Sequence, residues 1–76
     1  MMNALIMAGL EGKTDADGKK YTVTELARRA GITRAGAYRI LNGEVMPALD
    51  TAIRISRYVS ELYGYEVTVE ELWEVM

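Results

Sequence analysis

The sequence contains no cysteine and no histidine, and only one of its 76 residues is a proline. Without cysteine the chain forms no disulfide, and without histidine it has neither a conventional zinc site nor a histidine-based catalytic triad. A glycine-rich phosphate loop and a recognisable pair of catalytic carboxylates are also missing. We therefore expect a protein that is not an enzyme and that holds no metal, cofactor or small-molecule ligand. The absence of cysteine and of histidine suits a reducing compartment such as the cytoplasm.

Long hydrophobic runs are scarce as well. The apolar opening, MMNALIMAGL, is too short to span a bilayer, and it lacks the basic region and the cleavage site of a signal peptide. Half of the residues are apolar, as in a folded globular chain. The length predicts a single domain over residues 1–76. We expect a first helix over residues 2–10 that is buried on most of its sides, and no membrane partner.

Cations are absent from the end of the chain. Residues 58–76 contain no lysine or arginine and carry a net charge of −5. Residues 19–57 carry +5 and residues 1–18 carry −2, so the overall charge of −2 conceals a basic middle and an acidic tail. This asymmetry favours a nucleic-acid partner for the middle segment, and ordinary solvated surface is the alternative.

The clearest helix signal begins at Thr22. The Thr22-Val23-Thr24-Glu25 stretch is a capping-box pattern, in which the two end residues satisfy each other's backbone N–H groups. Gly31 ends this helix, because glycine adopts the left-handed conformation without steric cost. The periodicity predicts Leu26, Ala27 and Ala30 on the buried face, with Arg28 and Arg29 pointing outward.

A second short helix is predicted from Arg34 to about Leu41, capped by Thr33 and ended by Asn42-Gly43. Its inward positions are Ala37, Ile40 and Leu41. Gly36 lies within this helix, where an interior glycine costs roughly 1 kcal/mol relative to alanine. Either the backbone approaches a ligand closely at this point, or the glycine lies in the first turn, where its cost is small.

The other segments predict three further features. Residues 11–21 are polar, and their Asp17-Gly18 turn fits either an open loop or a small hairpin. A longer helix ends near Tyr63-Gly64, and one of its faces is formed by Leu49, Ala52, Ile53, Ser56 and Val59. The Thr68-Val69-Glu70-Glu71 stretch repeats the capping-box pattern and begins a terminal helix. The apolar side chains near the end either cap the core or form a dimer interface: Trp73, Val75 and Met76.

Two short helices joined by a glycine turn, the second of them cationic, are typical of a helix-turn-helix, here at about residues 22–42. A helix of eight residues is about 12 Å long, which matches the width of the major groove of DNA. Arg34 and Arg39 can each offer a two-pronged donor to guanine. The pattern therefore predicts a DNA-binding surface on the second helix.

The segments TELARRAGITR, RILNGE and PALDT resemble the lambda-repressor/Cro-type (XRE-type) helix-turn-helix family. The resemblance runs from about Thr22 to Val59 and resumes at Val69-Glu70-Glu71-Leu72. It implies an all-α, compact, five-helix lambda-repressor-like fold that binds double-stranded DNA, usually as a two-fold homodimer.

The resemblance also implies which residues contact DNA. Base reading falls on Arg34, Ala35, Gly36 and Arg39. Phosphate contacts are expected from Val23, Thr24, Thr33, Tyr38 and Asn42, with Lys19 and Lys20 of the polar insert as further candidates. Val23 stands where such proteins often carry a phosphate-binding glutamine, so its contact is reduced to backbone N–H groups.

Together these features predict a sequence-specific DNA-binding transcriptional regulator in the cytoplasm, associated with the nucleoid. The small size suits a phage- or plasmid-type Cro-like repressor that acts by occupying an operator. One alternative is an antitoxin of the same fold whose tail binds a toxin. Another is a protein-interaction module that has lost DNA binding, which the acidic net charge would suit.

Overall fold

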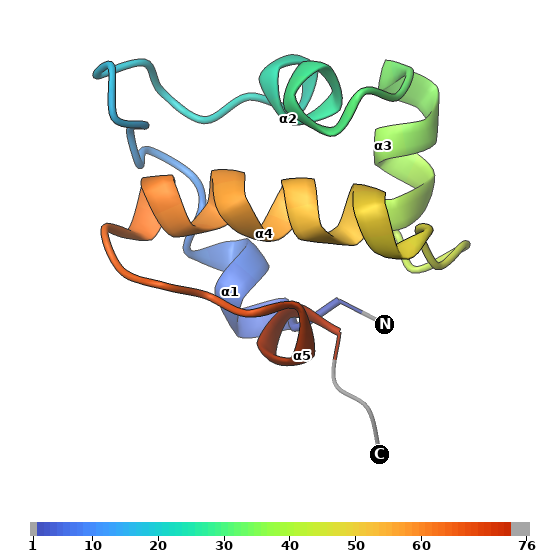
Figure 1. The fold of residues 1–76 in the computed structure, drawn as a ribbon. Helices are drawn as coiled ribbons and strands as arrows, with labels where there is room; N and C mark the ends of the chain where they lie inside the picture. The colour runs from blue at the N-terminus through green and yellow to red at the C-terminus, as the bar shows by residue number, and fades with distance from the viewer. Residues whose placement is uncertain (1, 74–76) are drawn as a thin grey trace.

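The computed structural model describes residues 2–73, and five helices lie within this range (Figure 1). They are α1 (Ala4–Ala8), α2 (Val23–Ala30), α3 (Arg34–Leu41), α4 (Leu49–Tyr63) and α5 (Val69–Leu72). The long helix α4 crosses the middle of the molecule, with α2 and α3 on one side of it and α1 and α5 on the other (Figure 1). The all-α, five-helix class expected from the sequence is confirmed. Within the described range no helix is long and apolar enough to cross a membrane.

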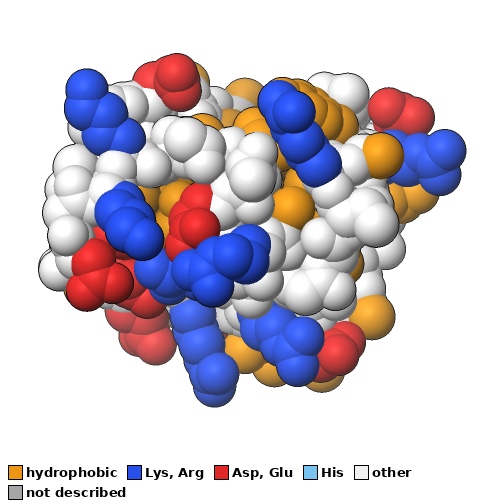
Figure 2. All heavy atoms as spheres, turned by 90° about the horizontal axis from the view of Figure 1, so that it is seen from above, with side chains coloured by type: hydrophobic (Ala, Val, Ile, Leu, Met, Phe, Trp, Pro, Cys, Tyr) orange, Lys and Arg blue, Asp and Glu red, His pale blue; other side chains and the backbone are white. Residues whose placement is uncertain are grey.

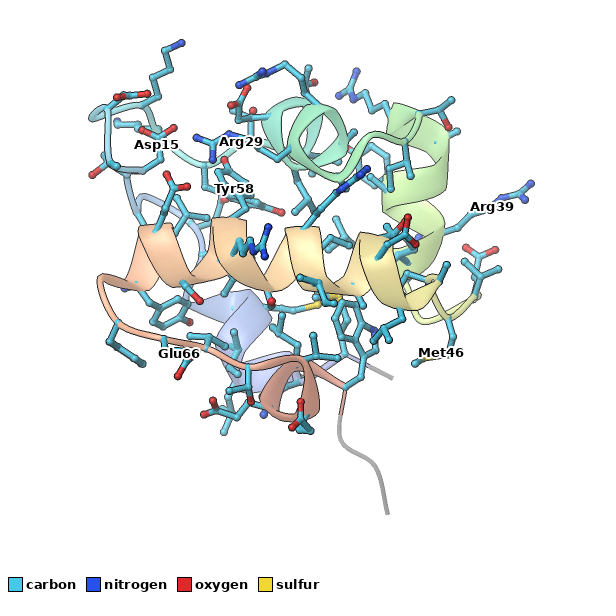
Figure 3. All side chains as sticks on the ribbon, viewed as in Figure 1. Asp15, Arg29, Arg39, Met46, Tyr58 and Glu66 are labelled. Atoms are coloured by element: carbon cyan, nitrogen blue, oxygen red, sulfur yellow. The ribbon has the colours of Figure 1, made fainter. Side chains whose placement is uncertain are left out.

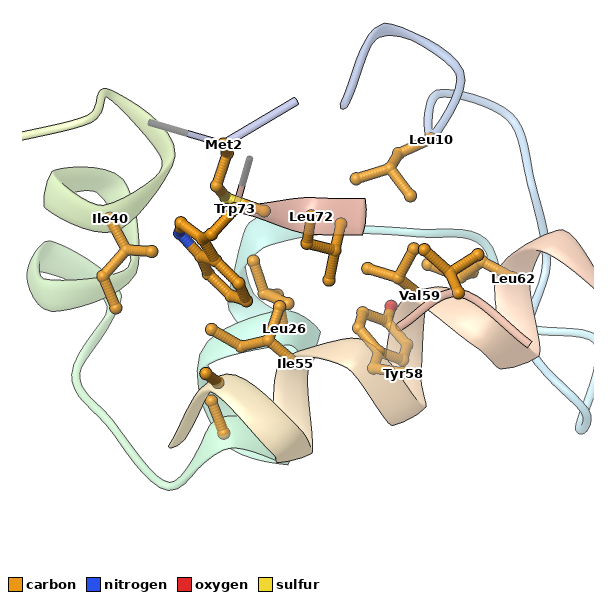
Figure 4. Packing of buried hydrophobic residues seen from close by; sticks show 13 residues of the cluster. Met2, Leu10, Leu26, Ile40, Ile55, Tyr58, Val59, Leu62, Leu72 and Trp73 are labelled. Carbon is orange, nitrogen blue, oxygen red and sulfur yellow. The ribbon is translucent and has the colours of Figure 1, made fainter. Parts of the chain in front are cut away.

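The core lies where α4 meets α2, α5 and the two ends of the described chain (Figure 4). Leu26, Ile55, Val59 and Leu72 are each at most 1% exposed. Burying an aliphatic side chain of this kind contributes ~1.5–3 kcal/mol. The ends close the core together, because Met2 and Trp73 form an antiparallel bridge.

The first helix differs from the expectation for residues 2–10. Helix α1 covers only Ala4–Ala8, none of its residues is buried, and the Leu5 side chain is 84% exposed. The buried residues are instead Met2 and Leu10, which flank the helix. The prediction of a helix buried on most sides is therefore wrong. An apolar sequence alone does not reveal burial, because apolar residues also occur at the surface of folded proteins.

Tyr63 attaches the end of α1 to the end of α4. Its hydroxyl donates a hydrogen bond of 2.6 Å to the carbonyl oxygen of Ile6. A Cβ atom on Gly9 would lie 2.2 Å from this hydroxyl, which is far inside van der Waals contact. A side chain at position 9 would therefore displace the Tyr63 hydroxyl from this hydrogen bond.

The buried face of α4 also differs from the predicted one. Ala52, Ser56 and Val59 are buried as expected, whereas Leu49 is 70% exposed and Ile53 is only partly buried. The additional buried side chains of this helix are Ile55, Tyr58 and Leu62. The stripe is wider because α4 is packed from two sides, and Leu49 at the start of the helix lies beyond the edge of the core.

The polar insert forms a small hairpin rather than an open loop. Thr14 and Lys20 form an antiparallel bridge, and the Asp15 N–H donates to the Lys19 carbonyl oxygen over 2.8 Å. The Asp15 carboxylate accepts the N–H groups of Asp17 at 2.9 Å and Lys19 at 3.0 Å. One buried carboxylate therefore organises the turn.

Trp73 caps the core. Its side chain is 3% exposed, so of the two uses considered for the terminal apolar residues, the core applies to this one (Figure 4). Val75 and Met76 lie outside the described residues. The predicted capping box at Thr68 is confirmed in both directions, with Glu71 as its partner.

Candidate nucleic-acid interface

The turn between α2 and α3 is made by Gly31. This residue has φ 73°, in the left-handed region, and its N–H donates to the carbonyl oxygens at the end of α2. The Ile32 N–H then donates to the Ala27 carbonyl oxygen over 3.0 Å, and the Ile32 side chain packs against the core. The turn is thereby closed tightly enough to hold α3 in one orientation relative to α2.

Helix α3 begins with a local cap. The Thr33 hydroxyl accepts the N–H of Gly36 over 3.0 Å. Gly36 is thus the third residue of α3 and lies in its first turn, where a glycine is least costly. A Cβ atom at this position would lie 3.2 Å from the Thr33 hydroxyl oxygen, so a larger residue would press on the cap.

The two sides of α3 differ in character. Ala37 and Ile40 are buried, and Leu41 packs against the core from a partly buried position. These three are the inward positions predicted from the periodicity; burial is confirmed for Ala37 and Ile40, and Leu41 faces the core but is only partly buried. Their packing against the core leaves the opposite side of the helix facing solvent.

The outward side of α3 carries the predicted cationic and aromatic groups. Arg34, Ala35, Tyr38 and Arg39 are all exposed. Arg34 lies over the ring of Tyr38, with its guanidinium carbon 5.6 Å from the ring centre. Figure 3 shows Arg39 projecting from α3 away from the rest of the molecule. No carboxylate of the described residues forms an ion pair with Arg34 or Arg39, so both charges are available to a partner.

The predicted phosphate-contacting residues belong to α2, α3 and the hairpin. Val23 and Thr24 are the first two residues of α2, whose N–H groups have no acceptor inside the helix. Asn42 follows the last residue of α3 and is exposed. Lys19 and Lys20 are exposed on the hairpin. Viewed from above, lysine and arginine side chains are spread across the face that carries α2 and α3 (Figure 2).

A family model described as Helix-turn-helix matches residues 17–59, which is more than half of the chain. The chain belongs to the XRE-type helix-turn-helix family. Comparison with curated proteins gave no match, and neither did comparison with solved structures. The protein is accordingly a DNA-binding regulator of the XRE type, and its partner is double-stranded DNA.

Sequence reasoning missed one charged cluster of this helix-turn-helix protein. Arg29 was expected to point into solvent, but its side chain is 23% exposed and its guanidinium contacts three carboxylates. The distances are 2.9 Å to Glu25, 2.8 Å to Glu61 and 3.1 Å to Asp15, whose side chain is 1% exposed. The same guanidinium lies 4.9 Å from the ring centre of Tyr58. Arg29 therefore connects the hairpin, α2 and α4 of the XRE-type domain.

Glu25 explains a second difference from the sequence prediction. The Thr22 hydroxyl accepts the Glu25 N–H over 3.1 Å, which is one half of the expected capping box. The Glu25 carboxylate does not complete the box, because it accepts hydrogen bonds from Arg28 and Arg29 instead. A cationic donor is a stronger partner for a carboxylate than a backbone N–H group.

The cluster predicts acid sensitivity of folding. Hydrogen bonds from Arg28 and Arg29 lower the pKa of Glu25 from 4.5 to about 2, and a hydrogen bond from Arg29 lowers the pKa of Glu61. A carboxylate whose pKa is lowered by folding stabilises the folded state above its ordinary pKa, and this contribution is lost as the pH falls through the folded-state pKa. We expect the free energy of unfolding to decrease between about pH 4.5 and about pH 2, as measured by urea denaturation at each pH. The Glu25→Gln variant should show a flatter pH profile, and an unchanged profile would assign the acid sensitivity to other carboxylates.

Proposed function

We propose that this DNA-binding regulator is a small Cro-like repressor that occupies an operator as a two-fold homodimer. The observation that carries the proposal is the outward face of α3, where Arg34 and Arg39 are exposed and unpaired among the described residues. A domain with these features and a recognition helix of eight residues can block a promoter simply by occupying its DNA. Such a repressor would work in the cytoplasm beside the nucleoid.

The proposed base contacts follow from the chemistry of this face. Arg34 and Arg39 each present a planar fork of donors that matches O6 and N7 of guanine in the major groove. Ala35 and Gly36 carry little or no side chain, so the first turn of α3 can approach the base edges closely. Tyr38 holds the Arg34 guanidinium over its ring and so restricts the directions in which that fork can point.

Contacts to phosphate would set the register of α3 in the groove. The N-terminus of α2 offers backbone N–H groups and the positive end of a helix dipole, which together favour a phosphate oxygen. Short polar and cationic side chains around the groove would add further contacts. The proposed set is Val23, Thr24, Thr33, Tyr38 and Asn42, with Lys19 and Lys20 on the hairpin.

Selection of bound fragments from random DNA tests the proposal directly. We expect the recovered sequences to share a palindromic motif whose half-sites are separated by about one helical turn, because a two-fold protein dimer requires two-fold DNA. Recovery of a single unrepeated half-site would contradict the dimer. Recovery of no preferred sequence would contradict the repressor.

Salt dependence distinguishes the repressor from a protein-interaction module of the same fold. Each phosphate neutralised by a lysine or arginine releases counterions, so the affinity for the selected DNA should fall steeply and linearly on logarithmic axes as salt rises. Fluorescence anisotropy with a labelled duplex between 50 and 200 mM salt, the range over which such losses are typically large, measures the slope. A flat response would favour the protein-binding alternative.

A further inference from the structure

A groove on the other side of the molecule is not used by the proposed DNA contacts. It has a volume of about 650 Å³ and lies between the C-terminal half of α4 and residues 64–69, which lead into α5. Ile53 and Val69 contribute partly buried apolar side chains to it. Tyr65 also lines it and is 63% exposed, an unusual exposure for a large aromatic side chain.

Three charged residues line the groove: Arg57 and Glu61 on α4, and Glu66 opposite them. Glu61 is paired with Arg29, which leaves Arg57 and Glu66 as the two charges without an ion pair among the described residues. Arg57 belongs to the α4 wall and Glu66 to the wall formed by residues 64–69. Both side chains are exposed, and neither forms an ion pair within residues 2–73. Arg29 differs from Arg57, because it pairs with three carboxylates of its own chain, including the groove residue Glu61.

A surface of this kind is complementary to itself. When two copies meet across a two-fold axis, each contact between different residues occurs twice, so Arg57 and Glu66 can form two attractive pairs. Exposed tyrosines are also enriched at the centre of protein interfaces, where their rings bury a large area at low entropic cost.

We propose that this groove is the dimer interface of the repressor, with Arg57 of each copy facing Glu66 of the other and Tyr65 packed between them. The inference rests on the proposed function and names the surface that its dimer uses. Trp73 is buried within its own chain and contributes little to such a contact. The groove shares no residue with the exposed face of α3, and Arg39 projects at the far end of the molecule from Glu66 (Figure 3). Both recognition helices therefore stay uncovered when two copies associate.

Reciprocal charge variants test the assignment. Arg57→Glu leaves acidic side chains at both position 57 and position 66, and Glu66→Arg leaves basic ones at both, so each variant should repel its own copy. In an equimolar mixture, the acidic side chains at positions 57 and 66 of one chain meet the basic side chains at these positions of the other. We expect the wild type to sediment as a species of twice 8.5 kDa in the absence of DNA. Each single variant should sediment at one chain mass, and the mixture should recover the double mass.

Two further variants test whether the effect is specific to the groove and whether it depends on charge alone. Arg54→Glu is the matched control, because Arg54 is exposed on the same helix but does not line the groove; it should sediment like the wild type. Tyr65→Ser should dissociate the dimer without changing any charge. Circular dichroism melting curves should show that all of these variants fold.

The possible outcomes separate this inference from the proposed function. Monomeric Arg57→Glu that still binds a single half-site duplex supports both. A wild-type protein of single-chain mass, equal dissociation by Arg54→Glu, or a mixture that stays monomeric would overturn the interface while leaving DNA binding intact. The interface would also be overturned if Arg57→Glu kept the wild-type mass but no longer bound the half-site duplex. That result would show that Arg57 contacts a DNA phosphate and not the second copy.

Discussion

Replacement of Arg39 by alanine is expected to weaken binding to the selected operator by about 1–3 kcal/mol and to relax the preference at one base position. The Arg39 side chain projects away from the protein and has no ion pair among the described residues, so its removal should leave the fold unchanged. The proposed contact is two-pronged and meets a base edge, so its free energy would be lost both in the variant and on a duplex with the wrong base at that position. Affinities for the operator and for its single-base variants, measured by fluorescence anisotropy, provide the comparison.

Lys20→Ala is the matched control for this experiment. Lys20 is an exposed cation on the hairpin, and its proposed contact is to phosphate. Its loss should weaken binding by a similar factor on every sequence and reduce the salt slope by about 1. The base-reading role of Arg39 is wrong if Arg39→Ala behaves in the same uniform way.

The second large effect concerns stability. Arg29→Ala is expected to lower the free energy of unfolding by about 3 kcal/mol, the lower end of the range for breaking a buried ion pair. The lower end applies because Arg29 is 23% exposed, whereas its partner Asp15 is 1% exposed and would be left as an unpaired charge away from water. Stacking on the ring of Tyr58 would be lost at the same time. Such a change is a large part of the stability of a small domain.

Arg28→Ala is the control that separates burial from charge. Arg28 lies next in the chain and pairs with the same Glu25, but its side chain is 66% exposed. Ion pairs between exposed side chains contribute little to stability, so this variant should unfold near the wild-type urea concentration. Equal destabilisation by the two variants would show that the buried carboxylate of Asp15 does not need Arg29.

The local features of this fold could be predicted because each is decided within a few residues. Thr33 and Thr68 cap the helices that follow them, and Gly31 ends α2 by adopting a left-handed conformation. The inward positions of α3 follow from its period alone. The exposed cationic face of α3 follows too, since a helix with one apolar stripe turns its remaining residues outward.

The errors occurred where a residue is placed by a distant part of the chain. Periodicity predicted burial for Leu49 and solvent exposure for Arg29, yet Leu49 lies past the edge of the core and Arg29 meets Glu61, 32 positions further along. The sequence did contain a signal for the turn at Asp15. Aspartate side chains in turns commonly accept the backbone N–H two residues further on, as Asp15 does from Asp17. Nothing in the sequence paired that carboxylate with Arg29.

By itself, then, the amino-acid order determined the helix-turn-helix, the caps at Thr33 and Thr68 and the side of α3 that faces outward, since these depend on contacts between close neighbours in the chain. Tertiary structure alone decided that α1 stays exposed, that the hairpin is attached through Arg29, and that Arg57 and Glu66 face one groove. The physical reason is that burial and ion pairing depend on which surfaces pack together. A short helix can pack in several ways and a long side chain can reach several partners, and only the folded chain selects one of them.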